Sequence, residues 1–233
     1  MGKDPSYRVG RIKAFIFDLD GTLLNTLTDI GDAVNRVLLK RGYPTHSMDR
    51  YRMFVGDGSE MLIKRALPKR ESSPGNVLAC LGEFKTAYEK TWDATTTPYD
   101  GIPELLNHLT REGIQLAVLS NKPHVFTRLC VDKQLASWTF EKVMGFSSEF
   151  PKKPDPAGAL SIMSDLNIDK KNCLYMGDSG VDMQTAAAAG LFSVGAAWGF
   201  RTETELMENG CQFLAKHPMD VISLMSNRQF SPW

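Results

Sequence analysis

A chain of 233 residues, 42% hydrophobic and 23% charged, can bury a core and form one domain with a large insertion or two modest domains. Lysine and arginine together number 27, as do aspartate and glutamate, so the formal net charge is zero. The sequence contains no run of five or more basic residues. Because such a run is typical of nucleic-acid binding, we expect no nucleic-acid partner.

The sequence also lacks the features of a membrane or secreted protein. No segment approaches the roughly eighteen unbroken apolar residues of a membrane span, and the start MGKDPSYRVGR lacks the apolar core of a secretory signal. The cysteines are widely spaced and form no C-x-x-C pair, which favours buried free thiols in a reducing compartment. They are Cys80, Cys130, Cys173 and Cys211. We therefore expect a cytoplasmic protein without a membrane partner.

The first predicted strand is AFIF, residues 14–17, and the sequence that follows it is helical in pattern. In LTDIGDAVNRVLLKRG (27–42), apolar residues at helical spacing predict a helix that Gly42 ends. The stretch GNVLACLGEFKTAYEKTW (75–92) repeats that spacing. Turn residues in TTTPYDG then indicate a linker near residue 97. The sequence thus predicts a helical insertion with boundaries near residues 26 and 97.

After residue 100, strand and helix patterns alternate along the chain. Strands are predicted at 115–120, 142–146, 173–177 and 192–197, and helices include 103–109, 124–135 and 182–190. This alternation predicts βαβ units and a parallel sheet, to which the first strand also belongs.

The predicted fold class is therefore α/β. We expect a Rossmann-like parallel-sheet core made from residues 1–25 and 98–233. Residues 26–97 are expected to form an α-helical cap domain, inserted after the first strand.

Polar residues follow four of the predicted strands at their carboxyl ends, where ligands bind in open parallel sheets. They are Asp18 and Asp20; Ser120, Asn121 and Lys122; Lys152 and Lys153; and Gly177, Asp178, Ser179 and Asp182. Carboxylates are the hard ligands that Mg²⁺ prefers, whereas lysines and hydroxyl groups bind phosphate oxygens. The strand ends therefore predict a site for Mg²⁺ and a phosphoryl group.

The pair Asp18 and Asp20 suggests why a cation is needed. In an extended segment both side chains point the same way, and Leu19 points the other. Neighbouring carboxylates repel each other, so they need a positive partner. We expect Mg²⁺ and Lys153 to supply that charge, and Gly21 to let the chain turn so that backbone N–H groups face the phosphate.

Four motifs occur in this order: DLDGT (18–22), LSNK (119–122), KPDP (153–156) and GDSGVD (177–182). Together they resemble the motifs of the haloacid dehalogenase-like (HAD) phosphohydrolases. Three further stretches are similar to the phosphoglycolate phosphatase-type branch of that superfamily. They are FVGDGSEMLIKRAL (54–67), PYDGIPELL (98–106) and AAWGFRTETELMENG (196–210).

The resemblance implies a Mg²⁺-dependent phosphatase that hydrolyses a small phosphomonoester, with phosphoglycolate as the first expected substrate. Asp18 would be the nucleophile that forms an aspartyl-phosphate. Asp20 would protonate the leaving oxygen and then deprotonate the attacking water. Asp18, the backbone carbonyl of Asp20 and Asp178 would hold the metal.

The same resemblance assigns the remaining site residues. Thr22, Ser120, the Asn121 backbone and Lys153 would bind the phosphoryl oxygens, and Asp182 would orient Lys153 or a metal-bound water. The cap would close over the site, with Gly56 and Lys64 as candidate contacts to the other end of the substrate.

Other functions remain open at this point. A β-phosphoglucomutase-like phosphomutase resembles the same motifs and differs mainly in how well its cap excludes water, and a pyrophosphatase is a further alternative. Outside enzymes, a non-catalytic phospho-ligand binding module could use the same fold. The intact acidic and basic residues of the motifs argue against that module. Dehalogenases of the superfamily lack the second acidic residue, so Asp20 argues against their chemistry.

Several of these residues also have purely structural interpretations. Ser120 and Asn121 fit a turn followed by a helix N-cap, Asp182 fits the first-turn charge of a helix, and Lys64 fits a surface charge. The D-x-D pattern also begins the EF-hand calcium loop, but Leu23 stands where that loop requires glycine.

Overall fold

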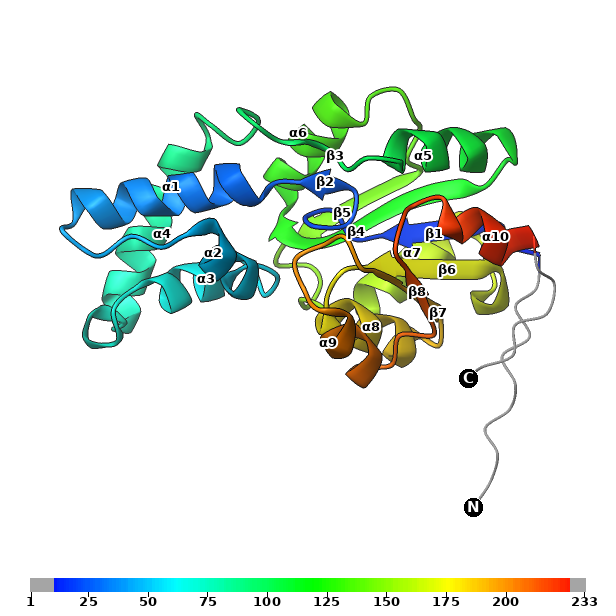
Figure 1. Ribbon diagram of the computed structural model, residues 1–233. Helices are drawn as coiled ribbons and strands as arrows, with labels where there is room; N and C mark the ends of the chain where they lie inside the picture. Colours follow the sequence, from blue (N-terminus) through cyan, green and yellow to red (C-terminus); the bar gives the residue numbers. More distant parts are fainter. Residues whose placement is uncertain (1–10, 227–233) are drawn as a thin grey trace, which may run out of the picture.

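The computed structural model describes residues 11–226 and is shown in Figure 1. Most of the start MGKDPSYRVGR, on which the expectation of no secretory signal depends, lies outside the described residues. Within residues 11–226, no helix combines the length and the apolar character that crossing a bilayer requires.

A six-stranded parallel sheet forms the centre of the fold (Figure 1). Its strands are β1 (Ala14–Phe17), β4 (Gln115–Pro123), β5 (Lys142–Phe146), β6 (Cys173–Gly177), β7 (Phe192–Ala196) and β8 (Phe213–Ala215). They lie in the order β5-β4-β1-β6-β7-β8, and all neighbouring pairs are parallel. The predicted α/β fold is confirmed, and β1 takes a central place because its residues are buried on both faces.

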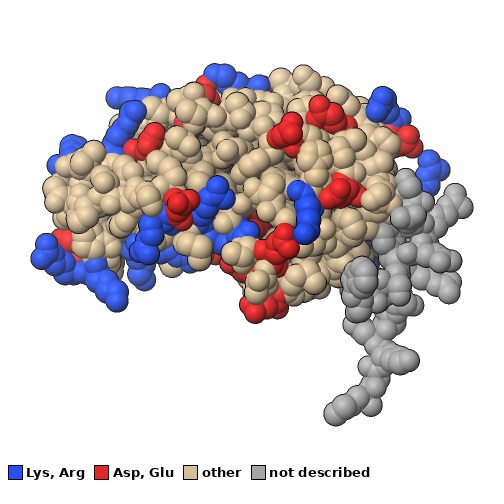
Figure 2. Space-filling model, in the orientation of Figure 1, with Lys and Arg blue, Asp and Glu red and all other residues tan. Residues whose placement is uncertain are grey.

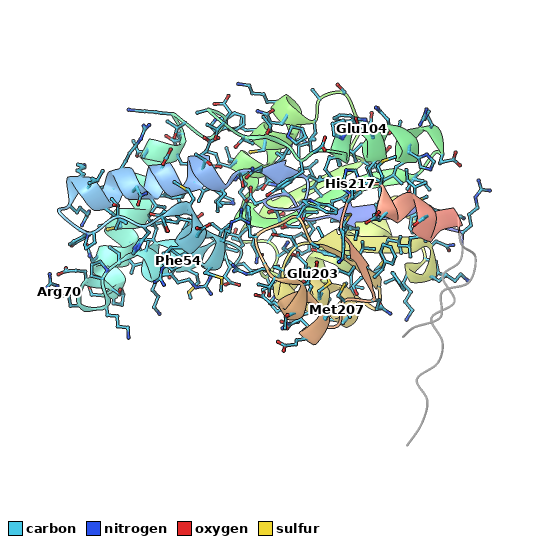
Figure 3. All side chains as sticks on the ribbon, in the orientation of Figure 1. Phe54, Arg70, Glu104, Glu203, Met207 and His217 are labelled. Atoms are coloured by element: carbon cyan, nitrogen blue, oxygen red, sulfur yellow. The ribbon has the colours of Figure 1, made fainter. Side chains whose placement is uncertain are left out.

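Helices cover both faces of the sheet. On the face that carries Phe15 and Phe17 pack α5 (Ile102–Arg111), α6 (His124–Gln134) and α10 (Asp220–Ser226). On the face that carries Ala14 and Ile16 pack α7 (Ala157–Leu166) and α8 (Gly180–Ala189), and η2 (Lys170–Asn172) precedes β6. In Figure 3, Glu104 on α5 and Glu203 on α9 (Glu203–Glu208) lie on opposite sides of the sheet.

A helical insertion, Leu27–Tyr88, separates β1 from β4. It contains α1 (Leu27–Lys40), α2 (Met48–Phe54), α3 (Ser59–Ala66), η1 (Lys69–Glu71) and α4 (Pro74–Tyr88). Their apolar side chains form one hydrophobic cluster, which Phe126 and Phe200 join from the sheet half. Figure 3 shows Arg70 at the end of the insertion farthest from the sheet.

The two helices predicted within the insertion correspond to α1 and α4. The first ends just before Gly42, as predicted, whereas α4 ends at Tyr88, earlier than its pattern suggested. Gly42 has a φ angle of 70°, and the N–H of Tyr43 donates to the carbonyl of Leu38 at 2.8 Å, which closes α1. This left-handed position explains why glycine follows the helix there.

A short antiparallel ribbon connects the insertion to the sheet half. It consists of β2 (Leu24–Asn25) and β3 (Thr97–Pro98). Next to it, the buried carboxylate of Asp29 in α1 accepts hydrogen bonds from the backbone N–H and hydroxyl groups of Thr95 and Thr96 at 2.7–3.1 Å. Asp29 therefore joins the two chain segments that enter and leave the insertion.

All four cysteines are buried and free, as the sequence predicts. Burial raises the pKa of the Cys130 thiol to about 11 and that of the Cys173 thiol to about 12. These thiols therefore remain protonated at neutral pH.

Candidate active site

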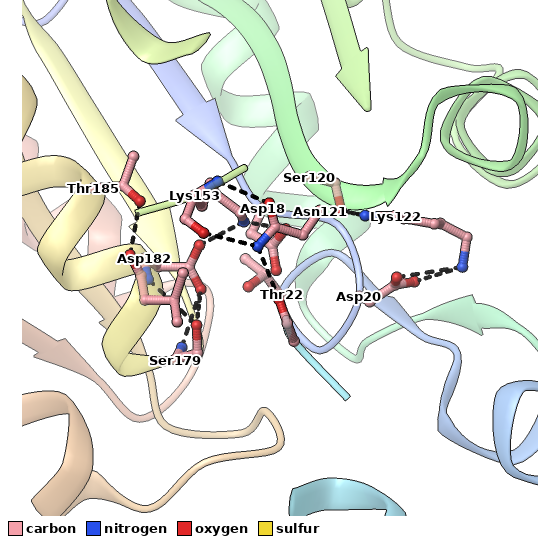
Figure 4. A network of polar contacts seen from close by, with 12 residues as sticks. Asp18, Asp20, Thr22, Ser120, Asn121, Lys122, Lys153, Ser179, Asp182 and Thr185 are labelled. Carbon is pink, nitrogen blue, oxygen red and sulfur yellow. Dashed lines mark hydrogen bonds and ion pairs between the residues drawn. The ribbon is translucent and has the colours of Figure 1, made fainter. Parts of the chain in front are cut away.

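The carboxyl ends of β1, β4 and β6 and the loop after β5 meet beneath the helical insertion, where they enclose a narrow cavity of about 50 Å³. From the sheet half, the predicted site residues that line it are Asp18, Asp20, Ser120, Asn121, Lys153 and Asp178, and Gly56 lines it from the insertion. Strand ends that are far apart in the sequence thus contribute to one site (Figure 4).

Lys153 is the cation at the centre of the acidic cluster. Its Nζ donates to Asp18 Oδ1 and Asp182 Oδ1, at 2.7 Å each, and only 4% of its side chain is exposed. Burial by itself would lower the pKa of Lys153, but the charges of Asp18 and Asp182 outweigh it and raise the pKa well above its ordinary value. The neighbouring Lys152 instead places its Nζ 4.5 Å from the centre of the Phe146 ring.

Three carboxylates surround this one ammonium group. Asp18, Asp178 and Asp182 each bring an oxygen within 4.8 Å of the others. Burial raises the pKa of Asp18 to about 7, although Lys153 opposes the shift. Burial, followed by the charge of Asp18, also raises the pKa of Asp178 well above its ordinary value. The cluster thus has more buried acid than base, and a bound divalent cation would balance it.

The chain also leaves room for Asp178 at this position. A Cβ on Gly21 or on Gly199 would overlap the side chain of Asp178, and Gly21 has a φ angle of 89°. The buried carboxylate oxygens of the cluster suit a small, hard divalent cation.

The carboxylate of Asp182 is already well supplied with hydrogen bonds. Besides Lys153, it accepts bonds from the Tyr175 hydroxyl at 3.2 Å, the Ser179 N–H at 3.1 Å and the Ser179 hydroxyl at 2.5 Å. Ser179 and Asp182 form the capping box of α8. Asp182 therefore caps a helix and orients Lys153 at the same time.

Thr22 is fully buried, and it is absent from the residues that line the cavity. Its hydroxyl donates to Asp178 Oδ1 at 3.3 Å, and its carbonyl accepts a hydrogen bond from Trp198 Nε1 at 3.0 Å. The other oxygen of Asp178 accepts from the Phe200 N–H at 2.7 Å. Thr22 thus holds a carboxylate in place.

Asn121 joins three parts of the site. Its side-chain amide donates to the carbonyl of Gly56 at 3.1 Å and to that of Lys153 at 3.2 Å, and it accepts from the Lys153 N–H at 2.9 Å. Ser120 lines the cavity beside it and accepts from the Lys122 N–H at 3.3 Å. These bonds connect the end of β4 to the loop after β5 and to the insertion.

Asp20 binds a different lysine from Asp18. The Nζ of Lys122 lies 3.0 Å from Asp20 Oδ1 and 3.3 Å from Oδ2 (Figure 4). We expected both carboxylates to face one spot and to share Lys153, but each binds a different lysine. The reason is that β1 ends at Phe17, so strand alternation does not extend to Asp20. The sequence placed Lys122 at the strand end, but no local pattern identified it as the partner of a residue 102 positions away.

Arginines dock the insertion onto the sheet half. Arg52 Nη1 donates to the carbonyl of Gly199 at 3.2 Å, and Arg201 donates to the carbonyls of Arg52 and, at 2.7 Å, Val55. Figure 2 shows Lys and Arg side chains gathered over the insertion and near its junction with the sheet half. Lys64, a predicted substrate contact, is exposed on α3 and is not among the residues that line the cavity.

Comparison with known proteins decides the family. The profile of the haloacid dehalogenase-like hydrolases matches residues 15–196. The chain belongs to the haloacid dehalogenase-like hydrolases. The matched region contains all four sequence motifs and therefore every residue of the acidic cluster.

Relatives point to one branch of this family. A phosphoglycolate phosphatase of Pseudomonas putida is 34% identical over 189 residues, which are 79% of this chain and 69% of that protein. Phosphoglycolate phosphatase 1 of Pseudomonas aeruginosa is 28% identical over 223 residues, 94% of this chain and 82% of that protein. The crystal structure of a predicted phosphoglycolate phosphatase from Haemophilus somnus 129pt has the same fold, with a TM-score of 0.83 at 24% identity over 92% of this chain and 98% of that one.

These comparisons confirm the resemblance to the phosphoglycolate phosphatase-type branch. They also confirm the predicted class of enzyme, a phosphatase of the haloacid dehalogenase-like family.

Proposed function

We propose that the protein is a Mg²⁺-dependent phosphatase that hydrolyses a small phosphomonoester through an aspartyl-phosphate, with phosphoglycolate as the first candidate substrate. The observation that carries the proposal is the buried pair of Asp18 and Lys153, 2.7 Å apart at the base of the cavity, with Asp178 beside it. Phosphoryl transfer requires mainly positioning and neutralisation of charge, and this arrangement suits both.

We assign the metal to Asp18, Asp178 and the backbone carbonyl of Asp20, which offer hard oxygen ligands. When bound, Mg²⁺ supplies positive charge that neutralises the phosphoryl oxygens. The excess of buried acid over base supports this assignment. Asp182 is assigned to orienting Lys153, because its oxygens already accept hydrogen bonds from four donors.

In the proposed reaction, a carboxylate oxygen of Asp18 attacks phosphorus and the bond to the leaving oxygen breaks, while Asp20 gives that oxygen a proton. Asp20 then takes a proton from the water that attacks the aspartyl-phosphate, which releases phosphate and restores both carboxyl groups. Lys153, Ser120 and the Asn121 backbone bind the phosphoryl oxygens. We assign Thr22 to holding Asp178 instead, since its hydroxyl is directed to that carboxylate.

We further propose that residues 26–97 form a cap domain that shields the site from water. The contact between Asn121 and Gly56 and the arginine bonds support a docked cap. Lys85 and Arg201 also line the cavity and suit an anionic substrate. The buried free thiols support a cytoplasmic location.

The test is phosphate release from phosphoglycolate, other phosphomonoesters and pyrophosphate, with Mg²⁺ or with EDTA. Asp18→Asn is compared with wild type and with Asp132→Asn, a control on the exposed side of α6. We expect wild type and Asp132→Asn to release phosphate with Mg²⁺ and not with EDTA. We expect Asp18→Asn to release phosphate at least about a thousandfold more slowly. Equal activity of Asp18→Asn, or no release by folded wild type from any substrate, would overturn the proposal.

A further inference from the structure

Lys122 connects Asp20 to the helical insertion. Its side chain is 4% exposed, and its Nζ donates to both carboxylate oxygens of Asp20. The same Nζ also donates to the hydroxyl of Tyr88, the last residue of α4, at 2.8 Å. The carboxylate of Asp20 is therefore held by a side chain from β4, which is in turn held by a hydroxyl from the insertion.

The position of Tyr88 depends on both halves of the molecule. Its ring stacks on Phe84 of the insertion, with centroids 5.4 Å apart, and it meets Phe126 of α6 edge-on at 4.9 Å. Tyr88 itself is 2% exposed. A hydroxyl at this place therefore reaches Lys122 only while the insertion is docked against the sheet half.

Two features make this contact more than packing. Hydrogen bonds that involve charged groups are strong and directional when they are buried, so an ammonium on both oxygens fixes the rotation of the Asp20 carboxylate. A general acid must lie within hydrogen-bond distance of the oxygen that it protonates, so this rotation determines whether proton transfer can occur. Lys153 cannot fix it, because its Nζ is directed to Asp18 and Asp182.

We propose that Lys122 and Tyr88 are positioning residues, which together hold Asp20 in the orientation that protonates the leaving oxygen when the insertion is docked. This inference rests on the proposed function and deepens it. The sheet half alone carries the nucleophile and the acidic cluster, whereas the orientation of the general acid requires Tyr88 from the insertion. A substrate whose leaving group needs no proton should therefore react without a correctly oriented Asp20.

The experiment compares kcat/KM for two substrates. The leaving group of phosphoglycolate is the alkoxide of glycolate, which requires a proton. The leaving group of p-nitrophenyl phosphate is p-nitrophenolate, which is stable without one. Because kcat/KM reports the steps up to the first irreversible one, it isolates formation of the aspartyl-phosphate. The variants are Lys122→Met and Tyr88→Phe, and the latter keeps the aromatic ring and its stacking.

Tyr51→Phe is the matched control. Tyr51 is the other buried tyrosine in the core of the insertion, and its hydroxyl donates to Asn35 Oδ1 at 2.7 Å. We expect Lys122→Met to lower kcat/KM for phosphoglycolate about a hundredfold and Tyr88→Phe about tenfold, and both to lower that for p-nitrophenyl phosphate less than about threefold. The control should leave the ratio of the two substrates unchanged.

If a variant lost kcat/KM equally for both substrates, its residue would have a structural role and the inference would be overturned. The inference would also be overturned if the ratio of kcat/KM for the two substrates were the same in Tyr88→Phe as in Tyr51→Phe. If Lys122→Met does not fold, Tyr88→Phe decides alone. Failure of the proposed function has a different signature, because wild type would then release no phosphate from either substrate in the presence of Mg²⁺.

Discussion

Replacing Asp29 with alanine should destabilise the junction between the helical insertion and the sheet half. The carboxylate accepts hydrogen bonds from Thr95 and Thr96, through both their N–H and their hydroxyl groups. Thr95 is exposed, so its donors can turn to water. Thr96 is 2% exposed, and its hydroxyl keeps a bond to the carbonyl of Trp92 at 3.1 Å, but its N–H would lose its acceptor.

The size of the effect follows from the Thr96 N–H, because water and the Trp92 carbonyl can replace the other bonds. An unpaired buried donor costs about 1–3 kcal/mol, and we expect Asp29→Ala to lower the free energy of unfolding by the upper end, about 3 kcal/mol, because the lost acceptor is a carboxylate. In a chain of this size, that loss corresponds to a decrease in Tm of about 6–12 °C. Asp29→Asn should lie between alanine and wild type, because the amide keeps one acceptor oxygen.

The assay is thermal unfolding followed by circular dichroism, with Asp32→Ala as the control. Asp32 is an exposed carboxylate on the same helix, so its removal should change Tm by less than about 2 °C. A Tm for Asp29→Ala within about 2 °C of the control would refute the reasoning, because the buried bonds would then contribute nothing to stability.

Three further predictions concern the site and the thiols. Burial raises the pKa of Asp18 to about 7 without metal, and a metal must displace that proton. The apparent Mg²⁺ affinity measured by calorimetry should therefore fall as the pH drops below 7, approaching about tenfold for each pH unit well below 7. Gly21→Ala should reduce phosphatase activity at least about a hundredfold while the protein stays folded, because the new Cβ would displace Asp178 and the φ angle of 89° disfavours alanine. With Cys130 and Cys173 buried and protonated, a thiol reagent at pH 8 should label no cysteine within minutes in the folded protein and all four in guanidinium.

Each prediction has a result that would contradict it. If Asp18 were already ionised in the free protein, Mg²⁺ affinity would stay constant between pH 5.5 and 7. The expected change over this range is at least about fifteenfold. The control for Gly21→Ala is Gly82→Ala, which changes an exposed glycine. If both variants had wild-type activity, displacement of Asp178 would not affect catalysis. Rapid labelling of native protein would mean that the thiols are accessible.

The strands were predictable because their signal is local. The runs at 14–17, 142–146 and 173–177 match β1, β5 and β6 residue for residue, since continuous apolar stretches bounded by turn residues are typical of strands buried on both faces. The short edge strand β8 was not predicted. Its three residues, Phe213–Ala215, are too few to show a period, and their pairing with β7 depends on the sheet.

The site residues that lie at strand ends were predictable from the sequence. Because parallel strands bring their carboxyl ends to one edge, Asp18, Ser120, Lys153 and Asp178 could be expected together, and all four line the cavity. Lys64 shows the limit of this reasoning. Its place in a motif-like stretch suggested a substrate contact, but the face of α3 that it occupies was set by the packing of Leu62 and Ile63.

By itself, the sequence determined the parallel sheet, the position of the helical insertion and the set of strand ends that meet, because apolar periodicity and turn residues act over a few neighbouring positions. Only the tertiary structure decided which charges pair. Lys153 and Asp18 are 135 positions apart, and Lys122 and Asp20 are 102 apart. Local spacing cannot distinguish such lysines from solvated ones, since what fixes their partners is the burial that removes water from around them.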